Sequence, residues 1–153
     1  MKQDPNSLGP TFDYSLPRSK ILRGRRNFER LFEKSTVHNS DSLQLRYRYY
    51  EDPAEGCYVG FIAPKRRIRK AVRRNKIKRL MREVYRMNQH YFGEFFSEDT
   101  FGMHAVFIAN KDSLTYSDIS RDMIPLLNQA REKLSIMSKK IKKNTPDANK
   151  RQT

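Results

Sequence analysis

Apolar and polar residues alternate over residues 43–50 in a way that predicts a β-strand with two different faces. From residue 43 to residue 49 leucine or tyrosine takes every second place, and glutamine or arginine stands between them. A period of two residues is that of an extended chain. Short apolar runs predict two further strands, over residues 57–63 and 104–109.

Apolar residues at helical spacing predict three helices, over residues 27–34, over 71 to about 91, and from residue 115 onward. Thr115 is the expected N-cap of the last helix, with Asp118 completing a capping box. Pro125 should kink that helix or shift its start. The expected order α-β-β-α-β-α is typical of an α+β fold, here an α-β sandwich with one small central sheet.

The two ends differ in composition from the middle of the chain. Residues 1–17 hold three prolines, and residues 139–153 are rich in lysine and lack aromatic residues. We expect a flexible N-terminal extension over residues 1–17, one folded domain over residues 18–138 and a disordered basic tail over residues 139–153. Cys57 is the only cysteine, which excludes an internal disulfide and fits a reducing compartment. Without an evident signal peptide or membrane span, we expect a soluble cytoplasmic protein that binds no membrane.

Positive charge is concentrated in one part of the chain. The 153 residues carry 32 Lys and Arg against 17 Asp and Glu, a formal net charge of +15. Residues 65–86 hold twelve of the basic residues and a single acid, Glu83. At about 100° per residue, the apolar residues of this helix gather on one arc and the basic residues on another.

A helix face of one sign repels itself, and a phosphate backbone relieves that repulsion while releasing counterions. Asn75 adds an amide that both donates and accepts, which suits a sugar or a base edge. A solvated face and a membrane-surface helix are alternatives, but the latter needs an apolar face that the core takes here. The expected RNA-binding residues are Lys65, Arg66, Arg67, Arg73, Arg74, Asn75, Lys78, Arg79, Arg82 and Arg86.

The run from Ala71 to Glu83 resembles the signature helix of the bacterial ribonuclease P protein family, Ala-Val-x-Arg-Asn-Arg-x-Lys-Arg-x-x-Arg-Glu. The positions in register are Arg74, Asn75, Lys78, Arg79, Arg82 and Glu83. The Phe-x-x-x-Phe spacing of Phe28 and Phe32 resembles the family's first helix. The resemblance extends over roughly residues 18–134. It departs from the family at two positions, with Arg69 where many members have glycine and Lys76 as the third residue of the Arg-Asn-Arg triplet.

The resemblance implies a fold in which a parallel βαβ connection crosses with left-handed sense. It implies a protein subunit that binds ribonuclease P RNA through the signature helix. It also implies that a cleft between the first helix and the sheet binds the single-stranded 5′ leader of precursor tRNA. The partner RNA, with its own Mg²⁺ ions, performs the hydrolysis, so the protein is expected to need no catalytic residue and no cofactor, as a monomer in a 1:1 ribonucleoprotein.

Aromatic side chains are the candidates for the leader cleft, because stacking on a base contributes roughly 1–3 kcal/mol. We expect Phe28, Phe32 and Tyr47 to line it. Packing in the core is the alternative for the two phenylalanines. Arg46 and Arg48, on the opposite face of the strand, are candidates to contact phosphates or only water.

Two other functions compete with this one. A structural RNA-binding protein of the ribosomal or assembly-factor kind would explain the charge but not the signature pattern. A stand-alone metal-dependent nuclease needs a convergent set of acids or histidines. The acids Glu94, Glu98 and Asp99 lie near a probable loop, where such groups are usually solvated, and we expect no metal site.

Overall fold

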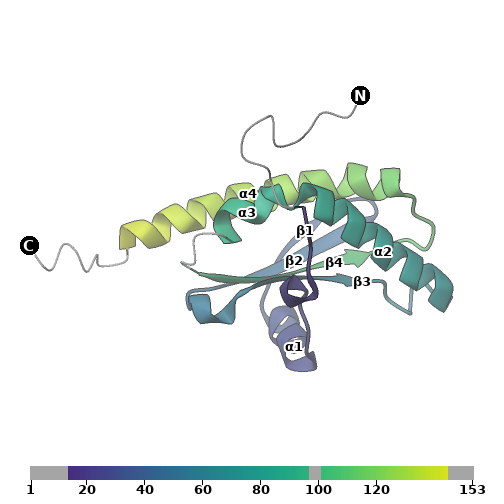
Figure 1. Ribbon diagram of the computed structural model, residues 1–153, viewed down its shortest axis with the longest axis horizontal. Helices are drawn as coiled ribbons and strands as arrows, with labels where there is room; N and C mark the ends of the chain where they lie inside the picture. The colour runs from purple at the N-terminus through teal and green to yellow at the C-terminus, as the bar shows by residue number, and fades with distance from the viewer. Residues whose placement is uncertain (1–13, 97–100, 145–153) are drawn as a thin grey trace, which may run out of the picture.

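The structure is a computed structural model that describes residues 14–96 and 101–144, with a central sheet and helices on both of its faces (Figure 1). The helices are α1 (Arg25–Glu33), α2 (Ala71–Asn88), α3 (His90–Phe96) and α4 (Tyr116–Asn144), and the strands are β1 (Thr36–Asn39), β2 (Leu43–Tyr50), β3 (Cys57–Ile62) and β4 (Gly102–Ala109). Two short 3-10 turns are η2 (Arg18–Lys20) and η3 (Pro53–Glu55). The predicted α+β class is confirmed, and β1 and α3 are additions to the predicted elements.

The four strands form one mixed sheet in the order β1-β2-β4-β3. The β1–β2 and β2–β4 pairs are antiparallel, whereas β3 and β4 are parallel neighbours. The chain passes through α2 and α3 between these two parallel strands, so the expected βαβ connection is present. Its left-handed sense stays a prediction.

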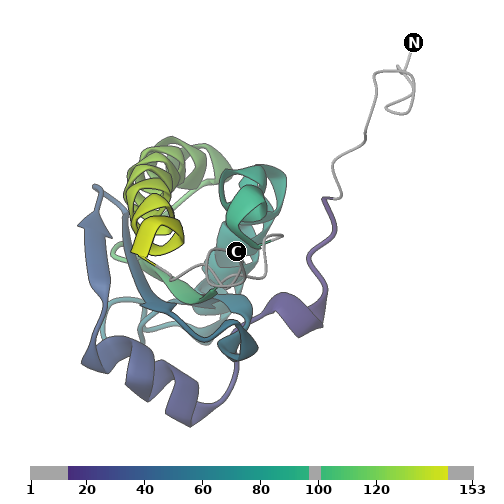
Figure 2. The ribbon, with the colours of Figure 1, turned by 90° about the vertical axis from the view of Figure 1, so that its left-hand side faces the viewer.

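The sheet separates two unequal layers. Helices α2, α3 and α4 cover one face and α1 lies against the other (Figures 1 and 2). The alternation along β2 decides which side chain goes where, because Leu43, Leu45 and Tyr47 are buried in the larger core. Arg46 and Arg48 point toward α1.

Helix α4 begins as the sequence predicts. The Thr115 N–H donates to the Asp118 carboxylate (3.0 Å), and the Asp118 N–H donates to the Thr115 hydroxyl (3.1 Å). This reciprocal pair satisfies two N–H groups that the first helical turn leaves without partners. Pro125 lies inside the helix, which is continuous from Tyr116 to Asn144.

Both predicted domain boundaries need correction. The tail was expected to start at Lys139, but α4 continues to Asn144, because the amphipathic pattern of this helix carries on past the last buried leucine. At the other end, Leu16 packs against the core and the Gln89 side chain donates to the Ser15 carbonyl (2.9 Å). Residues 14–17 therefore belong to the packed part, and the rest of the two predicted tails lies outside the described residues. Among the described residues, no helix is long and apolar enough to cross a membrane.

Candidate nucleic-acid interface

Helix α2 presents a basic face because its apolar side chains are used to cover the sheet. The buried residues of α2 are Ile77, Met81, Val84 and Tyr85, so one side of the helix is anchored from its middle to its last turns. The opposite side is left to solvent, and it carries the basic residues of the signature pattern. The predicted division of this helix into two faces is confirmed.

Four residues on this side of α2, three of them basic, converge on one hollow of about 370 Å³, which we call the α2 hollow. They are Asn75, Lys78, Arg79 and Arg82. The other wall comes from Phe28 of α1, from β3 and from the segment Ile21–Leu22. None of the described residues that line the α2 hollow is acidic. This hollow therefore combines aromatic surface with uncompensated positive charge.

Gly60 allows the aromatic wall of the α2 hollow to lie close to the sheet. A Cβ atom on Gly60 would be 3.3 Å from the ring of Phe28, a tighter contact than side chains normally make. With only hydrogen there, the half-buried ring lies directly on β3 beside the basic residues.

The remaining predicted basic residues lie around this centre, and several have protein partners. Lys65, Arg66 and Arg67 are exposed in the turn that leads into α2. Arg73 lies 3.9 Å from the carboxylate of Asp112.

Two of the predicted RNA-binding residues, one near each end of α2, make hydrogen bonds within the protein. We call the basic residues along the exposed side of α2 the basic row. The Arg74 guanidinium donates to the carbonyl of Arg69 (2.7 Å), which anchors the loop before the helix. Arg86 pairs with Glu83 (2.6 Å) and donates to the Tyr14 carbonyl (3.3 Å). The hydrogen bond from Arg86 holds the pKa of Glu83 below its ordinary value. Some of the ten residues expected from the sequence are thus engaged within the protein, so the surface open to a ligand is smaller than the sequence predicts.

On the face of the sheet toward α1, strand β2 presents arginines where Tyr47 was expected. The Arg46 guanidinium lies 5.4 Å from the ring centre of Phe32, which is 40% exposed. The Arg48 side chain donates to the Arg30 carbonyl (2.8 Å) and lies 4.9 Å from the ring centre of Tyr50. The surface where the leader cleft was expected therefore offers guanidinium groups beside a phenylalanine ring.

The prediction that Tyr47 lines this cleft with Phe28 and Phe32 is wrong. Tyr47 is 1% exposed and belongs to the core on the other face of the sheet, one position out of step with Arg46 and Arg48. Its ring stacks on His38 with centroids 5.6 Å apart, and its hydroxyl lies 3.3 Å from Nε2 of His38. Burial raises the pKa of Tyr47 to about 12. Its role is therefore structural.

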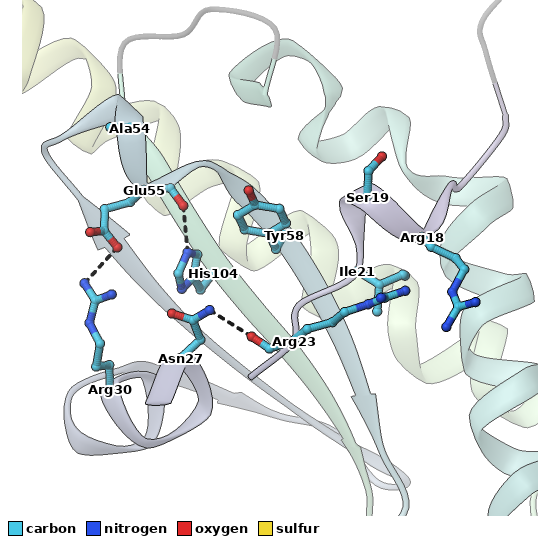
Figure 3. Close-up of a pocket in the computed structure, with 10 residues that line it drawn as sticks. All are labelled: Arg18, Ser19, Ile21, Arg23, Asn27, Arg30, Ala54, Glu55, Tyr58 and His104. Atoms are coloured by element: carbon cyan, nitrogen blue, oxygen red, sulfur yellow. Dashed lines mark hydrogen bonds and ion pairs between the residues drawn. The ribbon is translucent and has the colours of Figure 1, made fainter. Parts of the chain in front are cut away.

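A second hollow of about 550 Å³, which we call the α1 pocket, lies between η2, α1, η3 and the sheet (Figure 3). Among the described residues that line it are three arginines, Arg18, Arg23 and Arg30, and one carboxylate, Glu55. Sequence reasoning missed this pocket because its residues come from five separate elements and form no motif. A pocket of this kind becomes visible only once the topology brings those elements together.

The site has no feature of a metal centre among the residues that the structure describes. Within residues 14–96 and 101–144, no group of three or more His, Cys, Asp or Glu side chains is placed to hold an ion. The side chain of Glu94, and Glu98 and Asp99 entirely, lie outside the described residues.

Known proteins are similar in sequence to this chain over most of its folded part. The family model for Ribonuclease P matches residues 16–131. The ribonuclease P protein component of Chlorobaculum tepidum is 31% identical over 145 residues, covering 92% of this chain and 91% of that protein. The corresponding Nitrosomonas eutropha protein is 41% identical over 76 residues, covering 50% of this chain and 63% of that protein. The second alignment thus spans less than two thirds of its relative.

Solved structures agree with these relatives in fold. The RNase P protein of Staphylococcus aureus has a TM-score of 0.58 at 18% identity, covering 72% of this chain and 94% of that chain. The RNase P protein of Thermotoga maritima has a TM-score of 0.56 at 23% identity, covering 71% of this chain and 96% of that chain. The chain therefore belongs to the ribonuclease P protein component family.

Proposed function

We propose that this chain docks on ribonuclease P RNA through the α2 hollow and the exposed basic residues next to it. The observation that carries the proposal is the convergence of Lys78, Arg79 and Arg82 on one hollow with no acid in its described wall. Arginine forks match phosphate oxygens in pairs, and each neutralised phosphate releases counterions. Three exposed cations without acidic partners would add little to the stability of the protein itself.

The cleft between α1 and the sheet takes the single-stranded 5′ leader of precursor tRNA in this proposal. Phe28 and Phe32 offer rings for bases, and Arg46 and Arg48 replace Tyr47 as the contribution of β2. Arginine stacks on bases and also binds phosphates, so this composition suits leaders of many sequences.

Hydrolysis belongs to the partner RNA and its Mg²⁺ ions, and the protein contributes positioning and charge screening without a cofactor of its own. We place the complex in the cytoplasm, as one protein chain on one RNA.

Reconstitution tests the proposal. The purified chain is mixed with a bacterial ribonuclease P RNA at low Mg²⁺ and with precursor tRNA, and cleavage at the mature 5′ end is measured. We expect cleavage only when protein and RNA are both present. A variant with Lys78, Arg79 and Arg82 changed to alanine should fold and fail to assemble. Normal assembly of that variant at physiological salt would refute the docking surface, and cleavage by the protein alone would refute the division of labour.

A further inference from the structure

The α1 pocket contains an ion pair at a place where a polyanion would also bind. Nη2 of Arg30 lies 2.8 Å from Oε2 of Glu55, and the two side chains are 31% and 28% exposed. Arg18 and Arg23 line the same pocket and are exposed, with their guanidinium groups on the side away from the ion pair (Figure 3). The described lining of the pocket thus holds three arginines and one carboxylate, so it carries a net positive charge.

The main chain of Glu55 is held firmly, and its carboxylate is held by the ion pair at the pocket rim. Nε2 of His104 lies 3.0 Å from the Glu55 carbonyl oxygen, and the Glu55 N–H donates to the Asp52 carbonyl (3.1 Å). Gly102 presses against the same turn, since a Cβ atom there would lie 2.8 Å from Cβ of Glu55. Exchange of the carboxylate for another anion therefore requires a rotation of one side chain and no change in the turn.

Arg30 is placed for such an exchange before any ligand arrives. Its guanidinium lies 4.7 Å from the ring centre of Tyr50, and its own carbonyl accepts the hydrogen bond from Arg48. Stacking on an aromatic ring leaves the edge of a guanidinium group, which carries the N–H donors, directed away from the ring. A phosphate that replaced the carboxylate would meet a donor group that is already in position.

We propose that the α1 pocket binds a backbone phosphate of the single-stranded 5′ leader, and that this phosphate displaces the Glu55 carboxylate from Arg30. The inference rests on the proposed function, because it supplies a place for leader nucleotides beyond the rings of α1. The α1 pocket and the α2 hollow both have Ile21 in their walls, so they are neighbours on one surface. A strand that occupies the cleft reaches the α1 pocket without crossing the fold.

Glu55 then acts as a competitor that raises the threshold for RNA binding in this pocket. A single phosphate must replace an existing partner of Arg30, while a strand that also contacts Arg18 or Arg23 gains further charge contacts. The carboxylate therefore favours extended single strands over isolated anions. Such an exchange is feasible because a partly exposed ion pair contributes little to stability.

The experiment compares Glu55→Gln with Glu29→Gln in the holoenzyme assembled with ribonuclease P RNA. Both variants lose one negative charge and one ion pair. Glu29 lies on α1, pairs with Arg25 at 2.9 Å and does not line the pocket, so Glu29→Gln is the matched control. Glu55→Gln should bind precursor tRNA about two- to fivefold more tightly, as expected for release of one weak ion pair. It should leave mature tRNA unchanged, and Glu29→Gln should change neither.

The gain should vanish when Arg30 is also changed to Gln, because Glu55 acts through that residue. Arg30→Gln alone should weaken binding of precursor tRNA, which keeps the test valid if Glu55→Gln does not fold. Equal gains in Glu55→Gln and Glu29→Gln, or a gain that survives in the Arg30→Gln background, would overturn the inference. Equal affinity of the unaltered holoenzyme for precursor and mature tRNA would instead overturn the leader cleft of the proposed function.

Discussion

The guanidinium group of Arg74 donates a hydrogen bond of 2.7 Å to the main-chain oxygen of Arg69. A second bond, of 3.0 Å, goes to the oxygen of Ile68. Arg74 thus ties the loop that precedes α2 to the first turn of that helix. It stands in the basic row of α2 and serves the fold at the same time.

We predict that Arg74→Ala and Arg79→Ala separate stability from RNA binding. Arg74→Ala should lower the free energy of unfolding by about 1 kcal/mol, because two carbonyl groups lose a charged donor at a half-exposed site. Arg79→Ala, on the exposed side, should leave unfolding within about 0.5 kcal/mol. Both should weaken RNA binding, and Arg79→Ala should reduce the log–log salt slope by roughly 0.7–0.9. Urea denaturation and salt titrations measure the two effects; equal stabilities would contradict the role given to Arg74.

The two faces of β2 give a second prediction. Arg46→Ala should weaken binding of precursor tRNA to the holoenzyme and spare mature tRNA, because Arg46 lies over Phe32 in the cleft. Tyr47→Ala should instead lower the free energy of unfolding by about 3–5 kcal/mol, the usual cost of truncating a buried aromatic residue. Tyr47→Phe is the matched control, since it keeps the ring and removes only the hydroxyl near His38. A Tyr47→Phe protein of normal stability that loses leader binding would return Tyr47 to the site.

His104 should make stability fall in mildly acidic solution. Burial lowers the pKa of His104 below its ordinary value of 6.5, against an opposing effect of its hydrogen bond to Glu55. Since the unfolded chain then binds a proton that the folded chain does not, the free energy of unfolding should decrease as the pH falls below about 6.5. Denaturation between pH 7.5 and 5, a range that brackets the ordinary pKa of histidine, measures this decrease.

The comparison variant for this pH effect is His104→Gln, which keeps a donor for the Glu55 carbonyl. Its free energy of unfolding should depend less on pH over the same range. Part of the dependence should remain, because burial also lowers the pKa of His38. An unchanged pH dependence in His104→Gln would show that His104 is not responsible.

The sequence predicts those parts of the fold in which a period is carried by many residues. The alternation over residues 43–50 and the two arcs of α2 are examples, and both match the structure. It fails where an element is short: β1 has four residues without a clear pattern, and α3 has seven. Strand pairing at the edge and contact with α4 determine these elements, and neither is local in sequence.

The candidate site follows the same division. The basic row lies on one helix, so its spacing alone brings Asn75, Lys78 and Arg79 together. The alternation also placed Tyr47 opposite to Arg46; the error was to give the cleft to the aromatic face of the strand. The α1 pocket could not be predicted, because Arg18, Arg30 and Glu55 meet only through the topology.

The two sides of the sheet hold very different amounts of buried apolar surface. The α1 side has a small cluster built on Leu22, Leu31 and Val106, while the α2–α4 side holds the main core. Local opening is easiest where few apolar contacts must be broken. Hydrogen exchange of the α1 amides should therefore proceed through small fluctuations, whereas the amides of β4 and central α4 should exchange only on global unfolding. The proposed leader site is thus bounded by one compliant wall and one rigid wall, so its width can adapt to strands of different bulk while the proposed docking surface on α2 keeps its shape.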